Sequence, residues 1–271
     1  MSAPLWITLQ GADNVRDVGG LPTVDGGTVR PGRLIRADSL QTLTDSDVHL
    51  LVDVVGVRAV ADLRSDVEVD NEGPGPLTRE PRVEIAHLSL LPDAGTATDA
   101  AAAEDGVDAP VILPWQGRDE TLTDDERRRG ASAVYLHYLA ERADSIVAAL
   151  RLVAYTDGAT VVHCAAGKDR TGTVVALALD QIGVERAAIA ADYALSAERV
   201  PQIFARLAQR RTYADDIRPK ADDVDRHKPK AETMVVLLAA VDETHGGTQA
   251  WLRAQGWTDE DDAALRAALL G

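Results

Sequence analysis

The 271-residue chain contains a single cysteine, Cys164, and this scarcity restricts its chemistry. One thiol cannot form an internal disulfide, so no disulfide framework supports the fold. One cysteine and six scattered histidines also lack the spacing that metal ligands need. We therefore expect neither a metal nor any other cofactor.

Long apolar runs and excess positive charge are missing as well. No charged-then-apolar leader precedes Trp6 and no run is long enough to cross a bilayer, so we expect no secretory signal and no stable membrane insertion. The 28 Lys+Arg against 44 Asp+Glu give a net charge of −16, which argues against nucleic acid as a partner. A reducing, cytoplasmic setting is the default expectation, although export by an unassigned route stays open. The sequence is silent on oligomeric state.

Strand and helix signals alternate along the chain, which favours an α/β fold with a largely parallel central sheet flanked by helices. Strands are expected at 32–40, 57–64, 83–90 and 160–164. Helices are expected after Thr44 and Ser65, each of which begins a capping-box pattern, and over 132–155 and 171–183.

The carboxy-terminal third reads as helical, with segments near 185–199, 201–215, 231–245 and 258–270. We expect one domain over 1–271, interrupted by an acidic inserted loop at 92–129. An amphipathic pair at about 201–241 is a candidate helical lid, and a pair of ordinary core helices is the alternative.

The cysteine lies in "TVVHCAAGKDRTGTVVALAL", a β-branched strand followed by a glycine-containing basic turn and an apolar helix. In such a unit the N–H groups of the turn and of the first helical residues converge on one point, where an anion binds. Cys164 and Arg170 bracket the turn, and Gly167 in its middle can adopt a positive φ. The predicted phosphate-binding residues are Cys164, Ala165, Ala166, Gly167, Lys168, Asp169 and Arg170.

The partial positive charge of the helix N-terminus and of the basic turn also acts on the thiol of Cys164. Free cysteine has a pKa near 8.5, and helix N-termini with basic neighbours lower such values. We therefore expect a thiolate that attacks phosphorus and forms a phosphocysteine, with Arg170 clamping the phosphoryl oxygens. Thr171 could donate its hydroxyl to the sulfur, and we expect His163 to order the loop.

At these residues the sequence resembles a known family. "HCAAGKDRTG" is similar to the signature loop of the bacterial tyrosine phosphatase B (PtpB-like) group of cysteine-dependent protein and lipid phosphatases. "NVRDVGG" at 14–20, "VRPGRLIRADSL" at 29–40, "VADLRSDVEV" at 60–69 and "AADYALS" at 190–196 stand in the family's order. The resemblance implies Cys164 as nucleophile, Arg170 as phosphate clamp, and a phosphatase α/β domain with an added helical lid.

The proton donor to the leaving group has two candidates. Asp169 lies inside the loop, and the resembled group carries an Asp there; shaping the loop by an ion pair is its alternative role. Asp62 ends a parallel strand and so reaches the same sheet edge as Cys164. Its neighbour Arg64 could reach the phosphate, but a surface ion pair is the expectation, and Glu68 is explained by capping alone.

Phosphotyrosine, carried by a phosphorylated protein, is the first-choice substrate, with phosphoserine and phosphothreonine as further possibilities. A phosphoinositide or inositol phosphate is the alternative, because Lys168 beside Arg170 favours multiply charged phosphates. A non-catalytic phosphate-binding module and a sulfurtransferase are the other classes considered. The first normally lacks the Cys or the Arg, and the second typically has a shorter loop.

Overall fold

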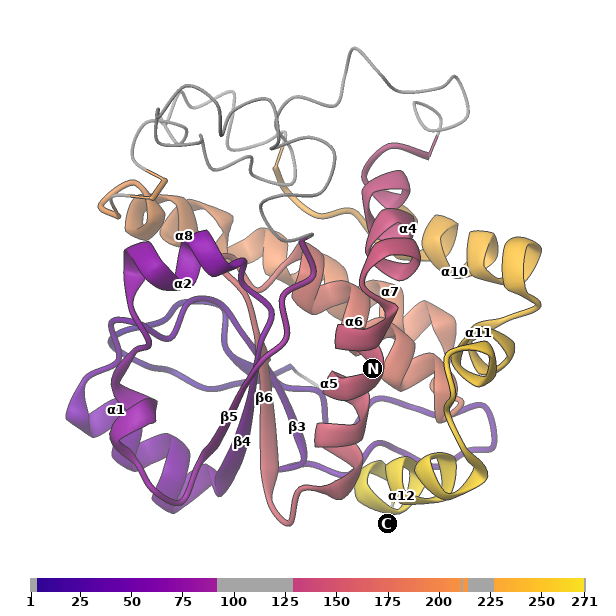
Figure 1. The fold of residues 1–271 in the computed structure, drawn as a ribbon, viewed down its shortest axis with the longest axis horizontal. Helices are drawn as coiled ribbons and strands as arrows, with labels where there is room; N and C mark the ends of the chain where they lie inside the picture. Colours follow the sequence, from indigo (N-terminus) through magenta and orange to yellow (C-terminus); the bar gives the residue numbers. More distant parts are fainter. Residues whose placement is uncertain (1–3, 92–128, 211, 214–226, 271) are drawn as a thin grey trace.

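The computed structural model describes residues 4–91, 129–210, 212–213 and 227–270, and it contains one mixed sheet with helices on both faces (Figure 1). The expected insert at 92–129, apart from Arg129, lies outside the described residues. The strands are β1 Leu5–Trp6, β2 Arg16–Asp17, β3 Leu34–Ala37, β4 Val57–Asp62, β5 Glu84–His87 and β6 Ala159–His163. The helices are α1 Asp45–His49, η1 Leu50–Val55, α2 Asp66–Glu72, η2 Pro76–Arg79, α4 Ala131–Glu141, α5 Ala143–Tyr155, α6 Asp169–Gln181, α7 Arg186–Leu195, η3 Ser196–Arg199, α8 Val200–Leu207, α10 Ala231–His245, α11 Thr248–Ala254 and α12 Asp259–Leu269.

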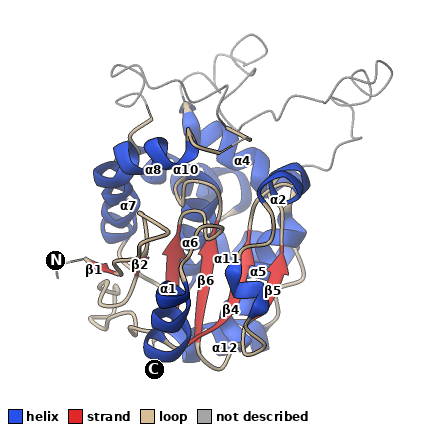
Figure 2. Ribbon diagram, turned by 90° about the vertical axis from the view of Figure 1, so that its left-hand side faces the viewer, coloured by secondary structure: helices blue, strands red, loops and turns tan. Residues whose placement is uncertain are grey.

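The strand order is β1-β2-β3-β6-β4-β5, with β6 hydrogen-bonded between β3 and β4. β3, β6, β4 and β5 are parallel, whereas β1 and β2 add an antiparallel edge. Figure 2 shows the strand arrows ending on the side of the molecule where α8 lies. The expected α/β fold with a mostly parallel sheet is confirmed, and the carboxyl ends of its strands define one edge.

Alternate side chains of the central strands pack in two separate cores, one on each face of the sheet, as a sheet covered on both faces requires. Val161 and Ile35 pack in a cluster with Leu51 and Val52 of η1 on one face. On the other face Val162 joins a larger cluster with residues of α4, α5, α6, α7, α10, α11 and α12. All five residues of β6 are buried, so the strand expected at 160–164 is confirmed, and it is covered on both faces.

Both expected capping boxes are present, at Thr44 with Asp47 and at Ser65 with Glu68. The expected continuous helix over 132–155 is wrong, because Arg142 (φ −131°, ψ 41°) separates α4 from α5. The two helices still bury one apolar stripe, formed by Tyr135, Leu139, Ile146, Leu150 and Val153. Side-chain periodicity continued across the break, so it could not reveal the change of direction.

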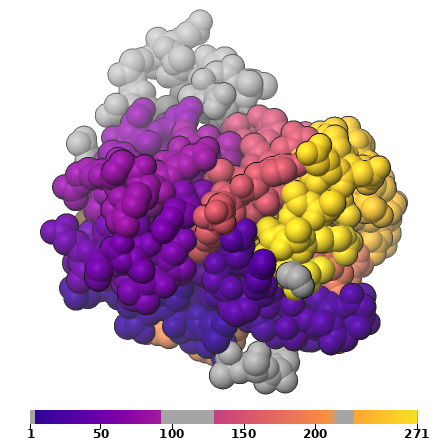
Figure 3. Space-filling model, turned by 90° about the horizontal axis from the view of Figure 1, so that it is seen from below, coloured from indigo at the N-terminus to yellow at the C-terminus, as the bar shows by residue number. Residues whose placement is uncertain are grey.

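The carboxy-terminal helices return to the beginning of the chain. Seen from below, they lie beside the amino-terminal residues (Figure 3), and the N–H of Arg30 donates to the carbonyl of Leu269 at 2.6 Å. The expected helical pair divides between two places. Ile203, Phe204 and Leu207 of α8 form a cluster of their own, whereas Met234, Leu237 and Leu238 of α10 belong to the larger core. In the described parts of the chain, no helix is both long and apolar enough to span a membrane.

Candidate active site

The loop from Cys164 to Lys168 joins the end of β6 to the first turn of α6. Its turn depends on Gly167, which has φ of +64° and lies against the end of β3. A Cβ at this position would be only 2.5 Å from the carbonyl oxygen of Ala37. Positive φ and close backbone approach both require glycine here, and they bring the loop onto the carboxyl edge of the sheet.

Cys164 lies at the start of this loop and is 2% exposed. The hydroxyl of Thr171, in the first turn of α6, donates to its Sγ at 3.3 Å. The first N–H groups of a helix lack intrahelical partners and carry partial positive charge, which favours a sulfur anion and a bound phosphate. The strand-loop-helix unit therefore brings the thiol, the hydroxyl and a helix N-terminus together.

Arg170 is held in place by a carboxylate of helix α2, which follows β4. Its Nη1 and Nη2 contact Oε2 and Oε1 of Glu68 at 2.5 and 2.8 Å, and Nη1 also donates to the carbonyl of Leu63 at 3.3 Å. Both ionic side chains are buried, at 3% and 0% exposure. A bidentate pair of this kind fixes the plane of a guanidinium group, and so determines where its remaining N–H donors point.

The electrostatics of this pair follow from the contacts. Burial opposes ionisation of Glu68, but the charge and hydrogen bonds of Arg170, with the Tyr213 hydroxyl at 2.6 Å, outweigh burial and lower the pKa of Glu68 to about 2. Burial likewise disfavours the Arg170 cation, yet Glu68 raises the pKa of Arg170 well above its ordinary value. Both groups are therefore ionised at neutral pH.

Sequence reasoning missed this role of Glu68. The expected capping box exists, with Oε2 accepting the N–H of Ser65 at 2.7 Å, but the same carboxylate also binds Arg170. The two partners are 102 residues apart in the sequence, and no local pattern signals a contact over that distance. Only the pairing of β4 with β6 brings them together.

Asp169, the first residue of α6, contacts one hydroxyl-bearing side chain and one cation. Tyr135 donates its hydroxyl to Oδ1, and Tyr193 lies 2.7 Å from the Tyr135 oxygen. Lys168 Nζ is 3.4 Å from Oδ2, and the Asp169 side chain keeps 15% exposure. Burial and the negative charge of Asp169 raise the pKa of Tyr135 well above its ordinary value, so this phenol stays a donor.

Asp62, the other candidate proton donor, already binds two basic side chains. Arg64 Nη2 contacts Oδ2 at 2.6 Å, and His163 Nε2 is 3.4 Å from Oδ1. Burial would raise the pKa of Asp62, but His163 and Arg64 outweigh it and hold this pKa well below the usual range. A carboxylate stabilised in this way is a poor acid at neutral pH. The expectation of a surface ion pair for Arg64 is wrong, because Arg64 is 1% exposed and pairs with Asp62 inside the protein.

The loop is covered on its outer side. Ala165 and Ala166 pack in one cluster with Val200, Ile203, Phe204, Leu207 and Tyr213. The Nζ of Lys168 donates to the carbonyl of His227 at 2.9 Å, and the His227 ring packs on Phe204 at 5.1 Å between centroids. Helix α8 thus rests directly on the residues predicted to bind phosphate.

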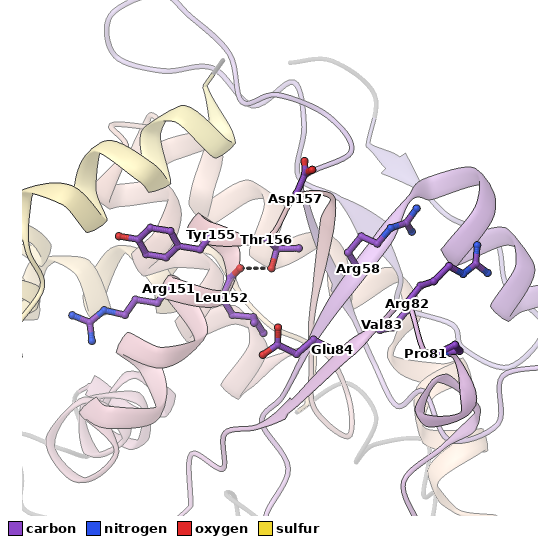
Figure 4. A pocket seen from close by; sticks show the side chains of 10 residues that line it. All are labelled: Arg58, Pro81, Arg82, Val83, Glu84, Arg151, Leu152, Tyr155, Thr156 and Asp157. Atoms are coloured by element: carbon purple, nitrogen blue, oxygen red, sulfur yellow. Dashed lines mark hydrogen bonds between the residues drawn. The ribbon is translucent and has the colours of Figure 1, made fainter.

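A pocket of about 630 Å³ lies at the other end of the sheet, beside the amino ends of β4 and β5. Figure 4 shows that the guanidinium groups of Arg82 and Arg151 on its rim point in opposite directions. Each is already paired, Arg82 with Asp53 and Arg151 with Asp261. The pocket contains none of the predicted site residues.

Within the ranges that the structure describes, no cluster of His, Cys, Asp and Glu could hold a metal ion.

A cysteine and an arginine that bracket a loop between a central parallel strand and a helix define a cysteine-dependent phosphatase. Residues 7–271 match the family described as "Tyrosine phosphatase family". The chain is 32% identical over 286 aligned positions to the triple specificity protein phosphatase PtpB of Mycobacterium tuberculosis, covering 97% of this chain and 98% of that protein. A tyrosine-protein phosphatase of Nostoc commune is 27% identical, covering 87% and 73% of the two chains. The chain belongs to the tyrosine phosphatase family, and it is a cysteine-dependent protein-tyrosine phosphatase.

The buried Glu68–Arg170 pair yields a prediction that combines stability with pH. Glu68→Gln leaves Arg170 charged and unpaired, which costs about 3–5 kcal/mol in known buried pairs. Because the pKa of Glu68 is lowered in the folded state, its contribution is complete above the unfolded pKa of 4.5 and is lost as pH falls from there toward 2. Urea unfolding should therefore show a large difference between wild type and variant at pH 7 and a smaller one at pH 3, with reduced phosphatase turnover at pH 7.

Glu72→Gln is the matched control, since Glu72 is at the end of the same helix but pairs with Arg210 at 2.9 Å. Equal effects of the two substitutions on both stability and turnover would contradict the special role of Glu68.

Proposed function

We propose that Cys164 is the nucleophile that takes the phosphoryl group from phosphotyrosine, with the loop 164–170 as its phosphate-binding site. The observation that carries this proposal is the convergence of the Cys164 thiol, the first turn of α6 and the Glu68-clamped Arg170 on one loop. The thiolate attacks phosphorus while the bond to the tyrosine oxygen breaks. Arg170 and the loop N–H groups balance the charge on the phosphoryl oxygens.

The leaving oxygen needs a proton, and Asp169 is the proposed donor. In the second step a water molecule attacks the phosphocysteine, Asp169 takes a proton from that water, and the sulfur leaves as a thiolate. The hydroxyl of Thr171, 3.3 Å from Sγ, stabilises this thiolate, and His163 orders the loop. Asp62 is instead a structural ion-pair partner, since His163 and Arg64 hold it ionised.

A single assay tests the nucleophile and the substrate class together. Wild type should release phosphate from phosphotyrosine peptides, with lower rates on phosphoserine and phosphothreonine peptides, and Cys164→Ser should bind substrate without turnover. Phosphoinositides belong in the same panel, because Lys168 adds charge to the site and favours multiply charged phosphates. Phosphate release by Cys164→Ser at the wild-type rate would exclude the thiolate mechanism. Faster release from phosphoinositides than from phosphotyrosine would make the lipid the preferred substrate.

The acid is identified by its dependence on the leaving group. Asp169→Asn should lower kcat on a phosphotyrosine peptide by about 10²–10⁴-fold, the usual contribution of a general acid, and by much less on an aryl phosphate with a good leaving group. The fall of kcat/KM on the alkaline side of the pH profile, where a general acid loses its proton, should disappear with it. Asp62→Asn should affect both substrates equally. A leaving-group dependence seen with Asp62→Asn alone would transfer the role to Asp62.

We also propose that α8 is the moving part of a cover over the loop. Cys164 and Arg170 are each 2% exposed, and α8 packs on Ala165 and Ala166, so a substrate reaches the loop only when α8 shifts. Phe204→Ala, which removes a large side chain from this contact, should speed inactivation of Cys164 by peroxide several-fold. Val235→Ala on the exposed side of α10 is the control, with folded fractions measured for each protein. Unchanged inactivation rates in both variants would contradict the cover.

The remaining proposals concern the setting of the enzyme. A thiolate nucleophile needs a reducing environment to stay active, which supports the cytoplasm as its location. The net charge of −16 supports a phosphorylated protein or a phosphoinositide headgroup bound at one local site rather than a nucleic-acid partner. Both cores lie on the two faces of one sheet, which supports a single phosphatase domain.

A further inference from the structure

Three sequence segments without a role in the mechanism meet behind the loop. They are "NVRDVGG" at 14–20, "LIRAD" at 34–38 and "AADYALS" at 190–196. Their polar side chains are almost completely buried, with exposures of 0% for Asn14, 0% for Arg16, 1% for Arg36 and 4% for Asp192. We call these four residues the rear scaffold. Groups this polar are buried only where they make specific hydrogen bonds.

The rear scaffold binds the carbonyl groups of the loop. Asn14 Nδ2 donates to the carbonyls of Ala166 and Gly167 at 3.0 and 3.2 Å. Arg36 Nη2 donates to the same Gly167 carbonyl at 3.0 Å. The preceding carbonyl, of Ala165, accepts the N–H of Ser39 at 3.1 Å. Three consecutive carbonyls are therefore hydrogen-bonded, two of them by the rear scaffold.

Because peptide groups are planar, the hydrogen bonds to these carbonyls also set the direction of the loop N–H groups. In a trans peptide the C=O and the following N–H point in opposite directions. The carbonyls of Ala166 and Gly167, held by the rear scaffold, thus direct the N–H groups of residues 167 and 168 away from it, toward the side on which an anion would lie. Such an array of N–H groups is preorganised before the ligand arrives, which avoids an ordering cost on binding.

Charge fixes the rear scaffold itself. Asp192 receives Arg16 Nε on Oδ1 at 2.8 Å and Arg36 Nη1 on Oδ2 at 2.6 Å, so two guanidinium groups share one carboxylate. Arg16 also donates to Oδ1 of Asn14 at 2.8 Å, which orients the amide so that Nδ2 faces the loop. Burial and the charge of Arg36 lower the pKa of Arg16 to about 10, which still leaves it charged at neutral pH.

We propose that Asn14 and Arg36, anchored by Asp192 and Arg16, are positioning residues that hold the loop in its phosphate-binding conformation. This inference rests on the proposed phosphate site at 164–170. The residues do not touch the substrate and act through the carbonyls of Ala166 and Gly167.

Arg36→Met is the principal test. It removes one donor to Gly167 and leaves Arg16 and Asp192 as a one-to-one pair, so neither buried charge is left without a partner. Binding of inorganic phosphate, measured by calorimetry, should weaken at least tenfold, and kcat on an aryl phosphate should fall. Arg36→Lys keeps the charge without the planar fork and should give an intermediate affinity.

Arg58→Met is the matched control. Arg58 lies in the same sheet and also donates to backbone carbonyls, those of Val52 and Val57 at 3.0 and 2.8 Å, but at the amino end of β4. It should lower the urea midpoint without changing phosphate affinity. Asn14→Ala provides a second route to the same readout if Arg36→Met does not fold, as judged by circular dichroism.

The outcomes separate this inference from the function on which it rests. Wild-type affinity and turnover in folded Arg36→Met or Asn14→Ala would overturn the positioning role and leave the phosphatase site intact. Failure of the wild type itself to bind phosphate and to turn over would overturn the proposed phosphate site, and the positioning role with it.

Discussion

The buried contact between Arg170 and Glu68 is the constraint on which the site depends. A guanidinium group cannot be left in the protein interior without a partner, and Glu68 provides one with two parallel contacts. Glu68 is itself fixed by the capping box that starts α2 immediately after β4. The loop after β6 and the helix after β4 are therefore held together by this ion pair and by the pairing of the two strands.

The parallel sheet concentrates polar groups at one edge while the surface as a whole is acidic. Asp62, Arg64, Cys164 and Arg170 all lie at or just beyond the carboxyl ends of β4 and β6. A chain with net charge −16 repels phosphate over long distances, so attraction has to be created locally by helix N–H groups and buried arginines. Burial serves this purpose, because a shielded cation is less screened by solvent and salt than one on the surface.

Much of the fold could be predicted because its signals are local. The β-branched run before Cys164, the glycine at the turn, and the capping pairs at Thr44 and Ser65 each determine structure over a few residues. The two-residue strands β1 and β2 carry too short a pattern to be recognised, and their formation depends on pairing with β3. The break at Arg142 is invisible to periodicity, because both helices bury the same stripe.

The site divides in the same way. The thiol, Thr171 and Arg170 belong to one continuous segment, and their proximity follows from a strand-loop-helix unit. The partners of that segment come from elsewhere: Glu68 through the pairing of β4 with β6, and Tyr135 and Tyr193 through helix packing around α6. Arg64 shows the limit clearly, since a charged residue after a strand reads as surface until its buried acceptor is known.

The strand order has a further consequence, for the route by which the chain acquires its shape. β6 inserts between β3 and β4, although both of those strands belong to the first quarter of the chain and β6 lies beyond its midpoint. During synthesis, β3 and β4 therefore emerge without the neighbour that separates them, and each presents an unpaired edge to other chains. Non-local pairings of this kind form slowly, since a long loop must close before any contact stabilises it. The central strand thus completes the sheet and forms the catalytic loop in the same event, so a nascent chain that ends before β6 has neither.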